Sequence, residues 1–77
     1  MKLLHEPIAV QTRKGWPVRL QRGESIVQVR DVLRVWVHQT GWWKVEERRE
    51  YFMLHTDAGV VVIYRKDGEW MLARSMD

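Results

Sequence analysis

The sequence predicts a small all-β domain, folded as a strongly bent sheet or small, partly open barrel of about six antiparallel strands. Apolar and polar residues alternate along most of the chain, which is the period of a half-buried strand. Each interruption of this alternation contains a glycine, as tight turns with positive φ require. No stretch has convincing helical spacing. The expected strands are residues 8–13, 16–21, 25–38, 47–55, 60–66 and 69–74.

The clearest turn is Asp67-Gly68. An Asp-Gly pair between alternating segments favours a two-residue type I′ hairpin. This turn fixes the register of the last two strands, because cross-strand partners must face each other. The resulting pairs are Lys66 with Glu69, Arg65 with Trp70 and Ile63 with Leu72.

The third expected strand, residues 25–38, has two distinct faces. One parity is apolar and is predicted to face the core. Asp31 interrupts it, so we expect a bulge or bend near Arg30 and Asp31, as strands that curl into a barrel often need. An amphipathic helix over residues 24–37 is the alternative, but β-branched residues and the alternation count against it. The apolar set is Val27, Val29, Leu33, Val35 and Val37.

The length of 77 residues indicates one domain, residues 1–77, with a thin core. The chain has no cysteine, and its three histidines lack metal-ligand spacing, so we expect neither disulfides nor a metal or other cofactor. Aromatic mass or a homo-oligomer must then add stability. Absence of cysteine, of a signal peptide and of an apolar segment long enough to span a membrane predicts a soluble, cytoplasmic protein without membrane contact.

The charge distribution favours an anionic partner. The net charge is +3, and residues 1–34 carry seven basic against three acidic side chains, 7 − 3 = +4. On the other face of the third strand, cationic side chains alternate with an aromatic ring: Arg30, Arg34, Trp36 and His38. This composition is typical of platforms that bind single-stranded nucleic acid, where cations hold phosphates and rings stack on bases. The alternative is a solvated basic face on which Trp36 covers one barrel end.

Trp42 and Trp43 form the second candidate site. Adjacent residues of a strand face opposite sides, so at most one of the two rings fits the core comfortably. An exposed tryptophan suits a protein interface. Both rings could equally close the ends of a thin core.

No catalytic constellation is visible. Residues 46–50 mix acidic and basic side chains and lead into a strand, which indicates surface ion pairs. Ser25 and Ser75 lie in no nucleophile motif. We therefore expect the protein not to be an enzyme.

A family resemblance lies within residues 32–72. Gly41-Trp42-Trp43 is followed by Arg49-Glu50-Tyr51-Phe52 and by a hairpin with Tyr64-Arg65 and Gly68-Glu69-Trp70-Met71-Leu72. This order resembles a small bacterial family of unknown function. It is also similar to the C-terminal segment of the ImuB-type Y-family polymerase homologues, which take part in damage-induced mutagenesis. The resemblance implies a shared β module in a DNA-repair setting. This chain carries no polymerase-like part.

Together these features predict a non-enzymatic accessory module that binds nucleic acid, chiefly single-stranded or damaged DNA, in repair or translesion synthesis. Arg30, Arg34, Trp36 and His38 would carry the binding, and Arg19 would add charge. The alternative is a protein-interaction module without nucleic-acid affinity. It would dock on a repair or polymerase protein through Trp42, Trp43 and Tyr51.

Overall fold

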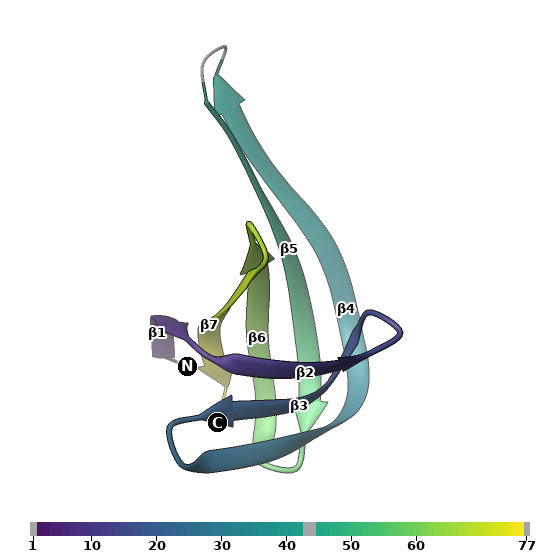
Figure 1. Ribbon diagram of the computed structural model, residues 1–77. Coiled ribbons are helices and arrows are strands. Elements are labelled where there is room, and N and C mark those ends of the chain that lie inside the picture. The colour runs from purple at the N-terminus through teal and green to yellow at the C-terminus, as the bar shows by residue number, and fades with distance from the viewer. Residues whose placement is uncertain (1, 43–44, 77) are drawn as a thin grey trace.

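The computed structural model of the protein describes residues 2–42 and 45–76, and the described residues form seven strands in one antiparallel sheet. The spatial order is β1-β7-β6-β5-β4-β3-β2, so every strand from β2 onward pairs with its successor (Figure 1). The predicted all-β, strongly bent sheet is confirmed. The strands are β1 (Lys2–Pro7), β2 (Ala9–Arg13), β3 (Trp16–Arg22), β4 (Ser25–Trp42), β5 (Val45–Thr56), β6 (Gly59–Lys66) and β7 (Glu69–Met76).

The six strands expected from the alternation correspond to β2–β7. Strand β1 was not predicted, and β4 is longer than expected at 18 residues. The predicted hairpin register is confirmed: Lys66 pairs with Glu69, and the other two predicted pairs also face each other. Asp67 and Gly68 have φ values of 51° and 78°, as a type I′ turn demands. In the part of the chain that the structure describes, no helix could cross a membrane.

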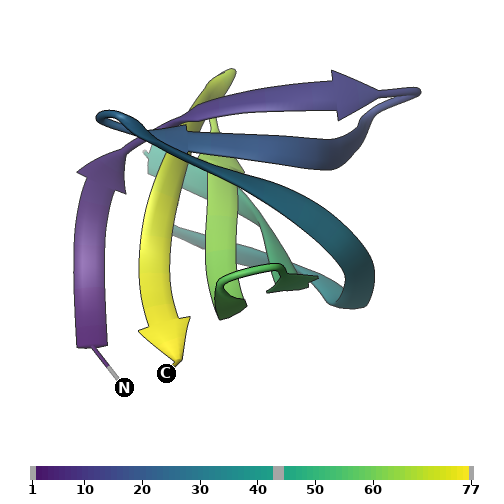
Figure 2. The same cartoon turned by 90° about the horizontal axis from the view of Figure 1, so that it is seen from below.

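Strand β4 bends the sheet into two layers. Its first residues, up to Gln28, pair with β3, and its remainder from Val29 pairs with β5. Figure 2 shows the layer of β2, β3 and the start of β4 crossing over the other strands. The register shifts between Val29 and Asp31, which confirms the predicted bulge, and a second, unpredicted shift follows between Val32 and Arg34.

The main core lies between the two layers. Leu54 and Ile63 are completely buried at its centre, and Leu20 reaches them from β3. A second, smaller cluster occupies the opposite face of β5, β6 and β7, which we call the outer face. It consists of Val62, Tyr64 and Ala73, with Trp36, Tyr51, Met53 and Met71 packed against them.

The prediction that the apolar parity of β4 is core throughout is wrong for Leu33, Val35 and Val37. These side chains are 52%, 44% and 49% exposed, whereas Val27 and Val29 do pack against the main core. The reason is visible in Figure 1, where the β4–β5 hairpin extends well past β2 and β3. Val35 and Val37 lie on the inner face of this arm, which lacks the layer that covers the rest of the sheet, and Leu33 lies in the second bulge without a partner on β5.

The two edge strands, β1 and β2, are joined by one residue, Ile8. Its amide donates a hydrogen bond of 3.2 Å to the carbonyl of Trp70. The chain therefore turns directly from one layer into the other, and the ends of the sheet meet at this corner (Figure 2).

Candidate functional site

Three aromatic rings form a row across the outer face, one from each of β4, β5 and β6. The register places Trp36 opposite Tyr51, and Tyr51 opposite Tyr64. The Trp36 and Tyr51 centroids are 5.2 Å apart with planes inclined by 2°, and the Tyr51 and Tyr64 centroids are 5.2 Å apart at 39°. Neighbouring strands are about 4.8 Å apart, so the rings stand on the sheet with their faces turned toward one another. We call this row the aromatic ladder.

Cationic side chains lie along the aromatic ladder. The guanidinium carbon of Arg34 is 5.2 Å from the Trp36 ring centroid, and that of Arg49 is 4.9 Å from the Tyr64 ring centroid. His38 meets the edge of Tyr51, with centroids 6.5 Å apart. Contacts of a cation with a ring face contribute about 0.5–1 kcal/mol at exposed sites. The outer face therefore combines cations with rings, as the sequence predicts.

Ion pairs neutralise much of the charge at the base of the arm. On the outer face Glu47 accepts a hydrogen bond of 2.7 Å from Arg49 Nε and forms an ion pair of 3.2 Å with Lys66. Hydrogen bonds from Arg49 first, and from Lys66 next, lower the pKa of the Glu47 carboxyl. On the inner face Glu50 pairs with Arg48 at 3.1 Å and Arg65 at 2.9 Å. The prediction of surface ion pairs is confirmed for residues 47–50, while the Glu46 side chain lies outside the described residues.

The predicted nucleic-acid residues are only partly brought together. Arg34, Trp36 and His38 share the outer face, because they lie opposite Met53, Tyr51 and Arg49 on β5. Arg30 lies in the first bulge and has no partner on β5. Arg19 lies on β3, opposite Gln28, in the other layer of the sheet. One compact platform of all five residues is therefore absent.

The predicted partner-binding residues are placed differently. Tyr51 is in the middle of the aromatic ladder, with one ring on each side, so its faces are occupied. Trp42 ends β4, paired with Val45. The Trp42 side chain and all of Trp43 lie outside the described residues.

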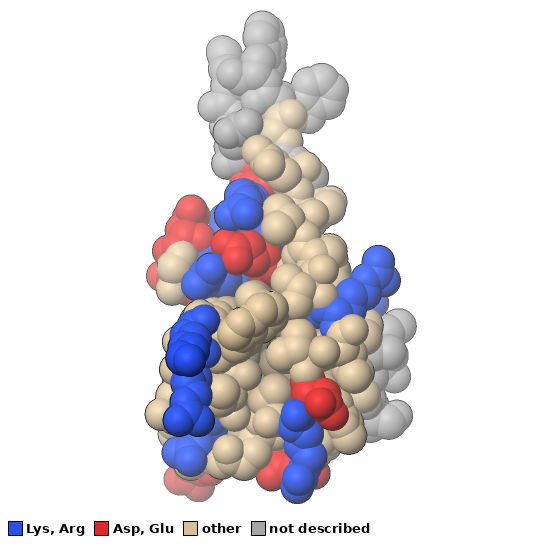
Figure 3. Space-filling model, turned by 90° about the vertical axis from the view of Figure 1, so that its right-hand side faces the viewer, with Lys and Arg blue, Asp and Glu red and all other residues tan. Residues whose placement is uncertain are grey.

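Strand β4 has a free edge that the sequence reasoning missed. Strand β5 pairs with one side of β4, and in the described ranges 2–42 and 45–76 no strand pairs with its second side beyond Gln28. Figure 3 looks at this edge and shows mostly uncharged surface along the arm, with a cluster of acidic and basic side chains on one side and basic side chains at the base of the arm on the other. The sequence does hold one sign of this free edge: the expected strand over residues 25–38 is much longer than its expected partner strand, residues 16–21.

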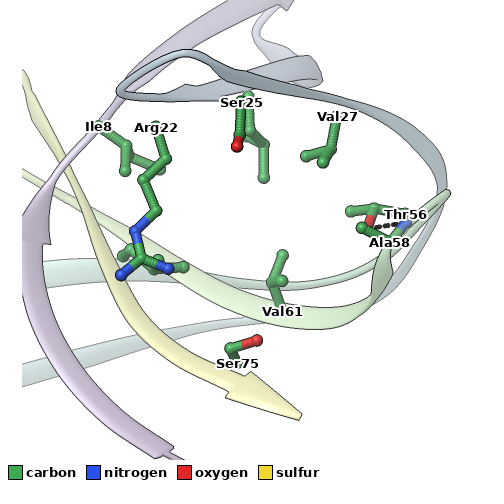
Figure 4. A pocket seen from close by; sticks show the side chains of 10 residues that line it. Ile8, Arg22, Ser25, Val27, Thr56, Ala58, Val61 and Ser75 are labelled. Atoms are coloured by element: carbon green, nitrogen blue, oxygen red, sulfur yellow. Dashed lines mark hydrogen bonds between the residues drawn. The ribbon is translucent and has the colours of Figure 1, made fainter. Parts of the chain in front are cut away.

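A small cavity of about 170 Å³ lies between the two layers (Figure 4). Leu20, Val27 and Val61 contribute to its mainly apolar lining. Arg22, the charged residue among the described lining residues, is paired with Glu6. The cavity can thus hold a small apolar group, but it presents no unpaired charge that would orient a ligand.

Among the described residues, no three His, Cys, Asp or Glu side chains are grouped so that they could hold a metal ion. Comparisons with protein-family models, with curated proteins and with solved structures find no match to this chain. The resemblance to the ImuB-type segment therefore stays a prediction.

Proposed function

We propose that the protein is a non-enzymatic protein-interaction module that binds an extended segment of its partner along the free edge of β4. The observation that carries this proposal is the side of β4 after Gln28, with which no strand among the described residues pairs. Backbone donors and acceptors on a strand edge are a template for one more strand.

The side chains beside this edge support the same function. Natural edge strands are commonly protected by lysine, proline or inward-pointing charge. Between Leu33 and His38 the sole charged side chain is Arg34, and exposed valines alternate with it on the other face. Trp16 adds further apolar surface on the inner side: it is 50% exposed and contacts Phe52 edge-on at 6.3 Å.

The resemblance within residues 32–72 favours a partner from a repair or polymerase assembly. In this proposal Trp36, Val35 and Val37 take the docking role that the sequence analysis assigned to Trp42, Trp43 and Tyr51. Tyr51 is suited to hold Trp36 in position, because its ring stacks on the indole from the neighbouring strand β5, away from the free edge.

The test is a comparison of two charge insertions on the same strand. Val35→Lys places a cation beside the free edge, whereas Ile26→Lys places one at a site that is 54% exposed and paired with β3. Immobilised wild type, V35K and I26K would be exposed to cell extract, and bound proteins identified. We expect partners that wild type and I26K retain and V35K loses. If V35K binds all the partners that wild type binds, the proposal that a partner strand adds to the free edge of β4 is contradicted.

Nucleic-acid binding is the second candidate, favoured by the grouping of Arg34, Trp36 and His38 on the outer face. Arg19, Arg30 and Arg34 are exposed and form no ion pair within the described residues. Stacking of bases on the platform is limited, however, because Tyr51 occupies one face of Trp36.

Titration of a labelled single-stranded oligonucleotide at low and physiological salt separates the two functions. Nucleic-acid binding predicts tryptophan quenching together with affinity that falls steeply as salt rises. Weak anisotropy changes without quenching would leave only general charge attraction and would remove this candidate.

A further inference from the structure

We infer that the partner best matched to the free edge of β4 is a second copy of the same edge. The two edges would pair antiparallel about a twofold axis that passes between the two copies of Trp36. This inference rests on the proposed function, because it uses the edge described there, and it names a second copy of the chain as the occupant in place of a repair or polymerase protein. A twofold arrangement uses one surface twice, so the edge must be complementary to itself.

The two faces of β4 restrict the registers that are available. Residues directly opposite in an antiparallel pair lie on the same face of the sheet, and a slip of one residue would exchange the faces. Val35 and Val37 lie on the inner face, opposite Phe52 and Glu50, while Trp36 lies on the outer face. Inner residues must therefore pair with inner residues, which leaves registers that differ by steps of two.

Only some of these registers match like with like. When the axis passes between the two Trp36 residues, these face each other on the outer side. On the inner side Val35 then faces Val37 of the second copy. The valines are 44% and 49% exposed in the single chain, so the pairing would cover apolar surface that the fold leaves open. An axis between the two Val37 residues would instead place Trp36 opposite His38, and Val35 opposite Gln39.

The aromatic ladder gives an independent reason for the axis at Trp36. Tyr51 and β5 lie on one side of the indole, and the Arg34 guanidinium carbon lies 5.2 Å from the ring centroid, so Trp36 of a second copy would approach the side that Tyr51 leaves open as Arg34 moves aside. A second copy in this register would extend the row from three rings to six across a continuous sheet. Aromatic pairs across neighbouring strands are among the stabilising cross-strand contacts.

The paired segment is short, because the second bulge, between Val32 and Arg34, interrupts straight pairing on one side. Interfaces of this size belong to the weak, concentration-dependent class. Arg34 would lie opposite His38 of the second copy, which places no two permanent charges of the same sign in direct opposition.

Sedimentation equilibrium from low micromolar to near-millimolar protein tests the association. We expect a monomer–dimer equilibrium, with the dissociation constant raised at least about tenfold by Val35→Lys, which removes both valine pairs, and unchanged by Ile26→Lys. Circular dichroism of each variant checks that the sheet remains folded.

Cross-linking through introduced cysteines tests the register. Because the sequence contains no cysteine, every disulfide must involve an introduced residue. Val35→Cys and Val37→Cys would be prepared separately with different tags, so that Trp36 is retained, and then mixed under mild oxidation. We expect the mixed V35C–V37C disulfide to exceed either homodimer, because cross-strand partners have Cα separations of about 4.5–5.5 Å, which a disulfide can span.

A wild type that stays monomeric at every concentration would overturn the second copy as the occupant. If V35K then still loses protein partners that I26K retains, only this inference fails. If no partner depends on the edge either, the proposed function fails with it. A dimer that V35K leaves intact, or that cross-links preferentially as V35C homodimers, would overturn the Trp36-centred pairing.

Discussion

The indole of Trp36 and the phenol ring of Tyr51 lie face to face on neighbouring strands, with centroids 5.2 Å apart and planes inclined by 2°. Tyr51 continues the contact to the buried ring of Tyr64. This row ties the projecting β4–β5 arm to the body of the sheet, so it contributes stability as well as surface.

Trp36→Ala should therefore destabilise the fold by about 2 kcal/mol, since an aromatic pair contributes about 0.5–1.5 kcal/mol beyond the apolar area it buries. Trp36→Phe keeps a ring on Tyr51 and should cost distinctly less. Guanidinium unfolding followed by far-UV circular dichroism measures both. Equal stability of W36A and wild type would show that the ladder is not structural.

Two leucines offer a matched test of where the core lies. Leu54 is fully buried between the layers, whereas Leu33 is 52% exposed on the arm. We expect Leu54→Ala to cost about 2–5 kcal/mol and Leu33→Ala below about 1 kcal/mol. Similar costs for the two, measured by urea unfolding, would contradict the exposed position of Leu33.

Thr56 holds the turn between β5 and β6 through its buried hydroxyl. The hydroxyl donates to the carbonyl of Gly59 at 2.7 Å and accepts from the amide of Ala58 at 3.1 Å. Thr56→Val keeps the shape but removes both bonds, so we expect a loss of about 1–3 kcal/mol. Thr56→Ser retains the hydroxyl and should recover much of this, as thermal unfolding of the two variants will show.

Gly68 adopts φ of 78° in the β6–β7 turn, in the left-handed region. A methyl group there would meet no atom within 4 Å, so the cost of Gly68→Ala comes from the backbone conformation alone. We expect about 1 kcal/mol of destabilisation. Asp67→Asn, which also tolerates positive φ, serves as the control and should change little. An unchanged melting temperature for G68A would mean that the turn relaxes to another type.

Glu47 makes stability depend on pH in the acid range. Its folded pKa lies below the ordinary value of 4.5, so its pairing with Arg49 and Lys66 is fully present above pH 4.5 and is lost as pH falls through the lowered pKa. Glu47→Gln should flatten this part of the profile, measured by urea unfolding at a series of pH values. Glu24→Gln, at an exposed acid without an ion pair among the described residues, is the comparison. An E47Q profile as steep as wild type would assign the effect to other carboxylates.

Local patterns accounted for most of the fold. Alternation located β2–β7, and the Asp67-Gly68 turn fixed the β6–β7 register, because both depend on neighbouring residues alone. Strand β1 escaped prediction, because the adjacent pairs Leu3-Leu4 and His5-Glu6 break the alternation of apolar and polar residues. The second bulge in β4 was also missed, since no charge marks it.

The candidate site depended on longer-range geometry, so less of it could be predicted. Parity correctly placed Arg34, Trp36 and His38 on one face. It could not show whether another layer covers the opposite face, which is why Val35 and Val37 were assigned to the core. The separation of Arg19 from this face follows from the bend of β4, and no local pattern encodes the direction of that bend.

The single residue between β1 and β2 has a consequence for exchange of strands between molecules. In domain swapping, an edge strand leaves its own sheet and takes the equivalent place in another copy. Strand β1 cannot leave β7 alone, because Ile8 provides at most about 3.6 Å of chain before β2 begins. Withdrawal of β1 would therefore also strain β2 and its pairing with β3, so the corner at Ile8 protects the chain against swapping of its first strand.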